Sequence, residues 1–263
     1  MQLFETLLYT VDQQIATITL NRPEVRNSLN QKLRLELREA VNRASADDNV
    51  RAVVLAASGA GFCAGADLTE RLPGSDQDGF VTRVLNEEYN PLILAIKKSP
   101  KPFVCAINGA AAGVGASLAL ACDLIVMAED AYLYSAFGAI SLIPDGGAHK
   151  LLLDQLGSKR TYEMIALSQK LSATHCVELG LANRVVPAEG LVNQAIQFAT
   201  QVSAAAPLTL QYSKQILREA QSYDLESVMA LEAEIQNRLF RSKDFREGAT
   251  AFFEKRKPEF EGC

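Results

Sequence analysis

Residues 103–128 read FVCAINGAAAGVGASLALACDLIVMA, and the fold class follows from the order of the apolar runs in them. Phe103–Ile107 and Leu124–Ala128 are short runs without a charged side chain, which is typical of strands buried on both faces. Between them, the alanine-rich run from Gly113 to Ala121 predicts a helix. A strand, a helix and a second strand in this order form a crossover unit, in which the two strands lie parallel in one sheet.

The chain upstream of this unit continues the same pattern. Ala52–Ala56 predicts a third buried strand, and Ile15–Leu20 alternates between its two faces as a strand does. Leu7–Thr10 precedes it across a short polar turn, which predicts a hairpin. Ser28 and Gln31 have the spacing of a capping box, and leucines at helical spacing follow them. We therefore expect an α/β fold.

The chain downstream of Pro187 changes character. It predicts amphipathic helices with little strand signal over residues 191–204, 208–220 and 225–239. We therefore divide the chain into a β/α core, residues 1–200, and a helical part, residues 201–263. The polar segment from Asp67 to Tyr89 contains Pro73-Gly74 and predicts a mobile region with a helix.

Composition narrows the class of protein. The chain has 263 residues and a formal net charge of −5, which argues against a nucleic-acid surface as the main partner. It contains no apolar run long enough for a membrane span and no signal-peptide pattern at its first residues. The number of cysteines is 5, with no Cys-x-x-Cys pair, which favours buried reduced thiols. We expect a cytoplasmic protein.

Three segments carry residues suited to chemistry. The small residues of Asn108 to Gly115 and of Gly61 to Asp67 each follow a predicted strand, where backbone N–H groups can meet a bound anion. Leu142-Ile143-Pro144-Asp145-Gly146-Gly147 places one carboxylate, that of Asp145, on a tight turn before a predicted helix. Amide donors together with one acid predict enolate chemistry on a carbonyl compound.

Each segment also has a purely structural interpretation. Taken alone, Asp145 ahead of two glycines is more typical of a helix N-cap than of a catalyst. The alternative interpretation of the glycine turns is that their small residues allow close packing, and the dinucleotide pattern G-x-G-x-x-G fails at Leu118. Cys63 has no neighbour in the sequence that would lower its pKa. The two histidines, His149 and His175, show no metal-ligand spacing, so we expect no metal.

Taken together, these segments resemble the enoyl-CoA hydratase/isomerase (crotonase) family over essentially the whole chain. The residues that carry the resemblance are Asn21-Arg22-Pro23, Asn27-Ser28-Leu29-Asn30, Phe62 to Leu68, Lys101-Pro102, Asn108-Gly109 with Gly113, Ala121-Cys122-Asp123, Leu142 to Gly147, and Arg246-Glu247-Gly248 with Ala251-Phe252. Each match alone is weak, but their order and spacing are specific.

The resemblance implies a spiral of ββα repeats in residues 1–200 that binds a CoA thioester. It implies a helical C-terminal part that forms a homotrimer or a hexamer, with a hydratase of the same family as a candidate partner. The thioester oxygen would accept hydrogen bonds from the backbone N–H groups of Ala66 and Val114. The positions that match CoA-binding residues are Arg22, Arg26, Ala64, Asp67 and Leu68. CoA is part of the substrate, so no separate cofactor is expected.

The departures from the family pattern indicate the reaction. Hydratases of the family hold water with two glutamates, and those positions here are Ser117 and Phe137. Asp145 falls where isomerases of the family place a catalytic carboxylate, and one carboxylate suffices to move a proton between two carbons. An apolar surround with Phe137 and Ile140 would raise the pKa of Asp145. We therefore expect an acyl-CoA isomerase.

One finer resemblance and two alternative functions belong to this expectation. Glu88 to Leu92, Gly109 to Leu120 and Ser141 to Asp145 are similar to the branch of the family that isomerises ring epoxides of phenylacetyl-CoA. One alternative is a hydratase that uses Asp145 or Ser117 to activate water. Another is a non-catalytic acyl-CoA-binding subunit of a multienzyme complex.

Overall fold

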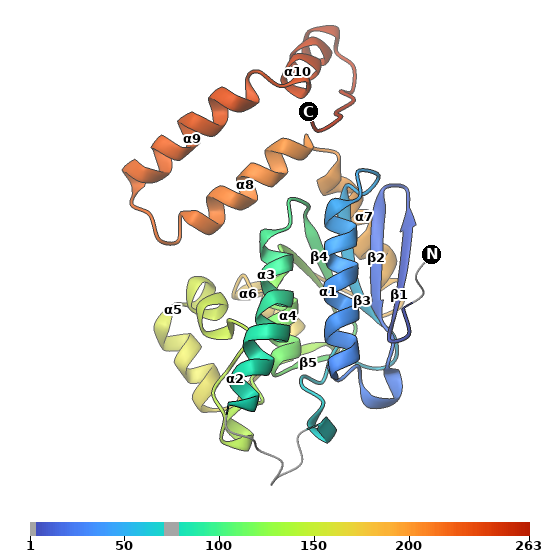
Figure 1. Ribbon diagram of the computed structural model, residues 1–263, viewed down its shortest axis with the longest axis vertical. Coiled ribbons are helices and arrows are strands. Elements are labelled where there is room, and N and C mark those ends of the chain that lie inside the picture. Colours follow the sequence, from blue (N-terminus) through green and yellow to red (C-terminus); the bar gives the residue numbers. More distant parts are fainter. Residues whose placement is uncertain (1–3, 71–78) are drawn as a thin grey trace.

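The computed structural model describes residues 4–70 and 79–263, and its centre is a six-stranded sheet in the order β1-β2-β3-β4-β6-β9 (Figure 1). β1 and β2 pair antiparallel, and every other neighbouring pair in this sheet is parallel. The parallel crossover predicted from residues 103–128 is therefore confirmed. The strands are β1 (Leu7–Asp12), β2 (Ile15–Leu20), β3 (Ala52–Ala57), β4 (Phe103–Ile107), β6 (Leu124–Ala128) and β9 (Arg184–Val186).

The predicted hairpin joins β1 and β2 through two residues. Gln13 and Gln14 have φ of 46° and 66°, so both lie in the left-handed region. Two-residue turns of this kind match the natural twist of the strands, although Asn-Gly suits them better than glutamine does. The hairpin prediction is confirmed.

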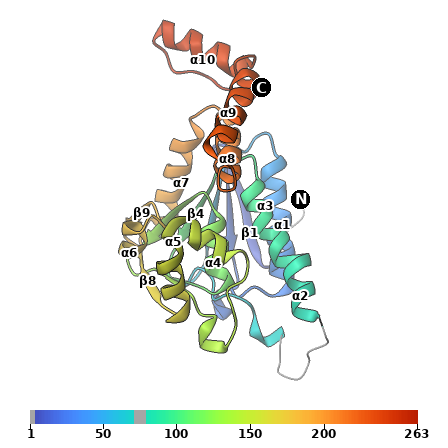
Figure 2. The ribbon, with the colours of Figure 1, turned by 90° about the vertical axis from the view of Figure 1, so that its left-hand side faces the viewer.

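Helices cover both faces of the sheet (Figure 2). On one face, α1 (Gln31–Ala46) packs against β1, β2 and α3 (Asn90–Lys98). On the other face, α7 (Leu191–Ser203) packs against β3, β4 and β6. α2 (Phe80–Val84) and a π-helical turn (Leu85–Tyr89) lead into α3. The Pro73-Gly74 turn proposed from the sequence lies outside the described residues.

The predicted capping box of the first helix is wrong. α1 begins at Gln31, and its N-cap is Asn30, whose side chain accepts a hydrogen bond from the N–H of Leu33. The hydroxyl of Ser28 instead donates to the carboxylate of Asp67, at 3.2 Å. As an N-cap the serine oxygen would accept from a backbone N–H, whereas here the hydroxyl donates to a buried carboxylate in a charge-assisted hydrogen bond, so Ser28 stabilises the neighbouring loop.

A second sheet adds a layer that the sequence did not predict. It has three strands, β5 (Ala110–Ala112), β7 (Tyr132–Tyr134) and β8 (Lys170–Ser172). β5 consists of three alanines, whose propensity favours helix, but parallel pairing with β7 overrides it. α4 (Val114–Ala121) begins directly after β5.

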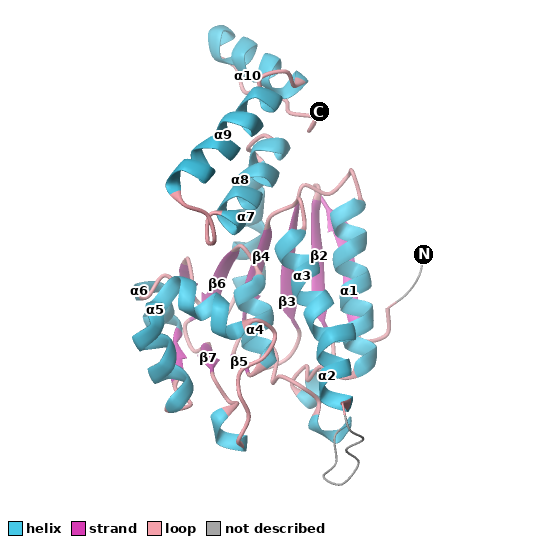
Figure 3. Cartoon of the chain, turned by 60° about the vertical axis from the view of Figure 1, so that its left-hand side comes forward, coloured by secondary structure: helices cyan, strands magenta, loops and turns pink. Residues whose placement is uncertain are grey.

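The remaining helices complete the chain. α5 (Ala148–Ala166) contains a kink at Gly157, where φ is 71°, and α6 (Ala173–Glu178) follows β8. α8 (Pro207–Glu219), α9 (Leu225–Leu239) and α10 (Lys243–Glu254) extend away from the sheet (Figure 3). α8 and α9 match the predicted helices, whereas α10 was not predicted. The division of the chain at residue 200 stays a prediction.

Several large apolar side chains of the helical part are exposed. Phe252 and Phe253 on α10 are 79% and 82% exposed. Among the described residues, no helix is both long and apolar enough to cross a membrane.

Candidate active site

The two predicted donor turns lie side by side, beyond the ends of β3 and β4. The N–H groups of Phe62 and Cys63 both donate to the carbonyl of Ala110 at 3.0 Å, and the N–H of Ala112 donates to Cys63 at 2.9 Å. A Cβ atom on Gly115 would lie 2.5 Å from the Cys63 carbonyl oxygen. Glycine at position 115 therefore allows the first turn of α4 to approach the loop that contains Ala66.

The backbone N–H of Ala66 points away from Leu29, to which the residues on either side of Ala66 bond. Leu29 donates to the carbonyl of Gly65 at 2.8 Å and accepts from the N–H of Asp67 at 3.4 Å. Both residues that flank Ala66 thus bond to Leu29, and in extended chain the amide between them faces the opposite side. Within residues 4–70 and 79–263 this N–H has no hydrogen-bond partner.

Val114 supplies the second N–H. It is the first residue of α4, and N–H groups in the first turn of a helix have no acceptor within the helix. Its N–H likewise has no partner in the part of the chain that the structure describes. The structure thus brings both predicted donor turns together and leaves both N–H groups without an acceptor among the described residues. That they bind a thioester oxygen stays a prediction.

Asp145 lies on a turn that packs against α4. The hydroxyl of Ser117 donates to the backbone carbonyl of Asp145 at 2.9 Å. A Cβ atom on Gly146, which has φ of 59°, would lie 3.0 Å from Cβ of Ser117 and 3.1 Å from Cγ2 of Val114. Gly146 thus needs to be glycine both for its backbone conformation and for this contact.

The alternative that Asp145 caps the following helix is wrong. α5 begins at Ala148, its N-cap is Gly147 with φ of 79°, and no side chain among the described residues caps it. The backbone carbonyl of Asp145 accepts from the N–H of Ala148 at 3.2 Å. Asp145 is half-buried, with one carboxylate oxygen fully buried.

The predicted apolar surround of Asp145 is only partly present. Phe137 is 7% exposed, and its ring lies 3.8 Å from where a Cβ on Gly113 would stand, so it packs beside the start of α4. Ile140 is 53% exposed and does not enclose the site within this chain.

Cys63 lies in the donor loop but is inert. Its side chain is fully buried, and its thiol donates to the carbonyl of Asn27 at 3.2 Å. Burial raises the pKa of Cys63 to about 12. A thiol that stays protonated is not a nucleophile.

Two of the predicted CoA-binding residues bind each other. Nη1 of Arg22 donates to Oδ2 of Asp67 at 3.0 Å and to the carbonyl of Ser28 at 2.5 Å. Asp67 also accepts from the hydroxyls of Thr69 and Ser28. Burial favours the protonated acid, but the hydrogen bonds from Thr69, Arg22 and Ser28 outweigh it and hold the pKa of Asp67 below its ordinary value. The pair fixes the donor loop to the loop after β2.

The other three predicted CoA-binding residues are exposed on these same loops. Arg26 has φ of 52°, and its carbonyl accepts from the N–H of Ala64 at 2.9 Å. Ala64 and Leu68 flank Ala66 on the surface. Arg26, Ala64 and Leu68 are therefore accessible to a ligand, and their binding to CoA stays a prediction.

Arg34 is a structural residue of the site that the sequence analysis missed. Its side chain is 4% exposed; its Nη1 donates to the carbonyl of Leu29 at 2.6 Å and to Glu70 at 3.0 Å. Its Nε donates to Glu88 at 2.6 Å. Arg34 thus fixes the backbone of Leu29, which in turn bonds to Gly65 and Asp67 on either side of Ala66. The sequence did contain a signal for it: Arg34 is a charged residue at helical spacing from Leu37 and Val41, which lie on the buried face of α1.

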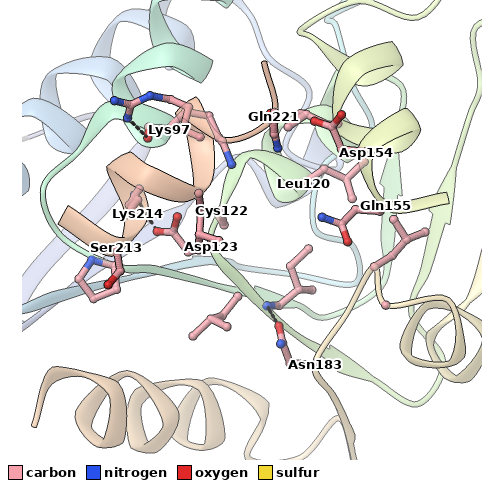
Figure 4. Close-up of a pocket in the computed structure, with 18 of the residues that line it drawn as sticks. Lys97, Leu120, Cys122, Asp123, Asp154, Gln155, Asn183, Ser213, Lys214 and Gln221 are labelled. Carbon is pink, nitrogen blue, oxygen red and sulfur yellow. Dashed lines mark hydrogen bonds and ion pairs between the residues drawn. The ribbon is translucent and has the colours of Figure 1, made fainter. Parts of the chain in front are cut away.

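A separate cavity of about 560 Å³ contains none of the predicted site residues (Figure 4). It lies between α3, α5, α8 and the start of β6. On its wall, Nζ of Lys214 donates to Asp123 at 2.7 Å and to the carbonyls of Ile96 and Lys101. Burial lowers the pKa of Lys214, and Asp123 opposes the shift. These three hydrogen bonds use all three hydrogens of the Lys214 ammonium group and connect α8 to the core.

The chain is similar to known proteins over nearly its whole length. Residues 10–263 match the model of the family described as enoyl-CoA hydratase/isomerase. The chain is 38% identical to a 1,2-epoxyphenylacetyl-CoA isomerase of Escherichia coli, covering 99% of this chain and 100% of that protein. It is 39% identical to a probable enoyl-CoA hydratase of Rhodobacter capsulatus, covering 98% and 99%.

The fold agrees with these sequence comparisons. The crystal structure of an enoyl-CoA hydratase from a Polaromonas species superimposes with a TM-score of 0.92 at 33% identity, covering 97% of this chain and 99% of the other. A match of this quality over the full length includes the central sheet, the second sheet and the C-terminal helices. This chain has the crotonase fold and belongs to the enoyl-CoA hydratase/isomerase family.

Proposed function

We propose that this protein isomerises an acyl-CoA thioester by moving a proton between two carbon atoms, with Asp145 as the acid/base group. The observation that carries the proposal is the position of Asp145, on a turn packed against Val114 and Ser117 in the first turn of α4. The same turn of α4 includes Val114, whose N–H is the proposed donor to the thioester oxygen.

The reaction needs one carboxylate and two amide donors. The Asp145 carboxylate removes a proton from C2 or C4 of the substrate, and the C–H electron pair moves into the conjugated system. The negative charge develops on the thioester oxygen, which accepts hydrogen bonds from the N–H groups of Ala66 and Val114. Protonated Asp145 then returns the proton at the other end of the dienolate. The shift is redox-neutral, so CoA remains part of the substrate and no separate cofactor takes part.

Hydration is the less favoured outcome because the residues at the hydratase positions cannot activate water. Phe137 carries no proton-transfer group, and the Ser117 hydroxyl already donates to the carbonyl of Asp145. A hydratase remains the second candidate, since the Rhodobacter capsulatus relative is named a probable enoyl-CoA hydratase.

The acyl group is proposed from the relatives. The Escherichia coli relative is, by name, an isomerase of 1,2-epoxyphenylacetyl-CoA. We therefore propose ring-epoxidised phenylacetyl-CoA, as in phenylacetate catabolism, as a substrate beside linear 3-enoyl-CoA.

The exposed helices support oligomer formation. Leu225, Phe252 and Phe253 are each at least three-quarters exposed, and a soluble protein rarely leaves such side chains to water on several helices. We propose that they are covered in a homotrimer or a hexamer. Light scattering of the purified protein measures the mass and distinguishes the two.

The Asp145→Asn variant tests the proposed function. Asparagine is nearly the same size but cannot accept a proton, so kcat for 3-enoyl-CoA should fall by about 10² to 10⁴ while a CoA thioester still binds. Asp130→Asn, on an exposed turn after β6, is the matched control and should keep full turnover. Undiminished isomerisation by Asp145→Asn would rule out the role of Asp145.

A substrate panel separates the candidate reactions. The wild-type protein is given 3-enoyl-CoA, 2-enoyl-CoA and the phenylacetyl-CoA epoxide, and the products are identified by mass spectrometry. Rapid addition of water to 2-enoyl-CoA, without double-bond migration, would favour the hydratase. Failure to exchange the C2 or C4 protons of any substrate with deuterated water would favour a non-catalytic acyl-CoA-binding subunit.

A further inference from the structure

Ser117 makes a hydrogen bond that is unusual for a serine inside a helix. It is the fourth residue of α4, and its side chain is fully buried among apolar neighbours. A helical serine commonly bonds back to the carbonyl four residues earlier, which here belongs to Gly113. The Ser117 hydroxyl instead donates to the carbonyl of Asp145, 28 residues later in the chain, at 2.9 Å.

The packing around this hydrogen bond leaves little freedom to the turn. Val114 and Ser117 are three residues apart and lie on one face of α4, and Gly146 rests on both side chains. Besides Ser117, the carbonyl of Asp145 bonds to the N–H of Ala148 at 3.2 Å. The hydroxyl is therefore the side-chain contact that attaches the backbone of Asp145 to α4.

We propose that Ser117 is a positioning residue that fixes the carboxylate of Asp145 relative to the N–H of Val114. This rests on the proposed function, in which Asp145 moves the proton and the Val114 N–H binds the thioester oxygen. Both groups act on the same substrate, so the distance between them sets whether C2 and C4 lie within reach of the carboxylate. Because Val114 and Ser117 belong to one rigid helix turn, the hydroxyl sets that distance.

The proposal also explains how Ser117 affects the choice of reaction. Serine has one hydroxyl hydrogen, and here that hydrogen is committed to Asp145. Ser117 therefore does not donate to a water molecule in the site. Gly146 packs closely on Ser117, since a Cβ atom on Gly146 would lie 3.0 Å from Cβ of Ser117. Ser117 thus favours proton transfer over hydration by holding the turn and by not offering its hydroxyl hydrogen to water.

The Ser117→Ala variant tests the proposal, with Ser99→Ala as the matched control. Ser99 is also a buried serine, but it bonds to Ser45 and Lys101 at the opposite end of β4 from the donor turns. We expect Ser117→Ala to lower kcat for 3-enoyl-CoA about 10-fold and to leave KM within twofold, because the Ser117 hydroxyl bonds to the Asp145 turn and not to the loops proposed to bind CoA. Ser99→Ala should keep kcat within twofold of the wild type.

A double-mutant cycle with Asp145→Asn separates positioning from general damage. The slow residual exchange of substrate protons with deuterated water is measured by mass spectrometry in Asp145→Asn and in Asp145→Asn with Ser117→Ala. If Ser117 acts through the carboxylate, removing its hydroxyl should change the residual rate less than twofold once the carboxylate is gone. An additional 10-fold loss in that background would overturn the proposal, because Ser117 would then act through the amide donors or the fold.

Two other results would distinguish a failure of the role proposed for Ser117 from a failure of the proposed function. A kcat of Ser117→Ala within twofold of the wild type would overturn the proposal even if Asp145→Asn is inactive, and the proposed function would survive. Full turnover by Asp145→Asn would instead remove the proposed function itself. If Ser117→Ala does not fold, Ser117→Cys keeps the side-chain volume with a weaker donor, and an unchanged kcat in that variant would likewise overturn the proposal.

Discussion

The loop that carries Ala66 and the turn that carries Asp145 are held in place by opposite means. Charged side chains fix the loop: Arg34 binds two glutamates beside it, and Asp67 accepts from Arg22 and two hydroxyls. Neutral contacts fix the turn: one serine hydroxyl and the close approach of Gly146 to α4. A carboxylate that must take up and release a proton is best held by its backbone, because a nearby cation would lower its pKa.

The largest expected effect on stability is at Arg34. Arg34→Met removes the cation that pairs with the carboxylates of Glu70 and Glu88, so we expect a loss of about 3 kcal/mol in the free energy of unfolding. Arg38→Met, one turn further along α1, is the control; Arg38 bonds a single backbone carbonyl, that of Glu87, and should lose well under half as much. Urea denaturation of both variants measures the difference. Equal losses would show that the charged cluster contributes little.

The turn should respond to steric change more than to charge. Gly146→Ala places a Cβ 3.0 Å from Cβ of Ser117 at a left-handed φ, so we expect about 2 kcal/mol of destabilisation together with at least a 10-fold loss of kcat. Gly147→Ala has a similar φ but no atom within 4 Å of the new Cβ, so it should lose about 1 kcal/mol and little kcat. Thermal melts and initial rates give both quantities. If Gly147→Ala were as inactive as Gly146→Ala, the contact between Gly146 and α4 would not be the cause of the loss.

The smallest effect should appear as a pH dependence at Asp67. The folded protein holds the pKa of Asp67 below its ordinary value, so its ionisation stabilises the fold above the unfolded pKa of about 4. The stabilisation is lost as the pH falls through the lower, folded pKa. Asp67→Asn should therefore be about 1 kcal/mol less stable at pH 7, with the gap closing in acid. Urea denaturation at several pH values follows it. A gap that stays constant from pH 7 to pH 3 would show that charge is not its cause.

Much of the fold could be predicted because its strands are continuous apolar runs. Ala52–Ala57, Phe103–Ile107 and Leu124–Ala128 are buried on both faces, so their sequences show no helical periodicity. β5 was not predicted, because its sequence lacks such an apolar strand pattern. Its three alanines carry no strand preference, and they form a strand because Tyr132–Tyr134 and Cys63 lie beside them in space.

The candidate site was predicted where short motifs fix the backbone and missed where distant residues meet. Ala66, Val114 and Asp145 each sit in a turn whose small residues are visible in the sequence. The bonds from Arg34 to Leu29 and from Ser117 to Asp145 join elements that are remote in the chain, and single-residue patterns carry no record of such pairs. The serine at position 28 shows the same effect, since its partner is Asp67 rather than the adjacent helix.

The contacts of Ser117 and Gly146 attach this turn to α4 through its main chain, so these two contacts do not depend on which side chain stands at position 145. A mutation there can alter the proton chemistry while these two main-chain contacts remain. Such a position is open to evolutionary exchange: a lineage can gain, lose or replace the acid by single substitutions while the oxyanion donors stay in place. That separation of scaffold from reactive group offers a physical basis for one fold serving both isomerases and hydratases.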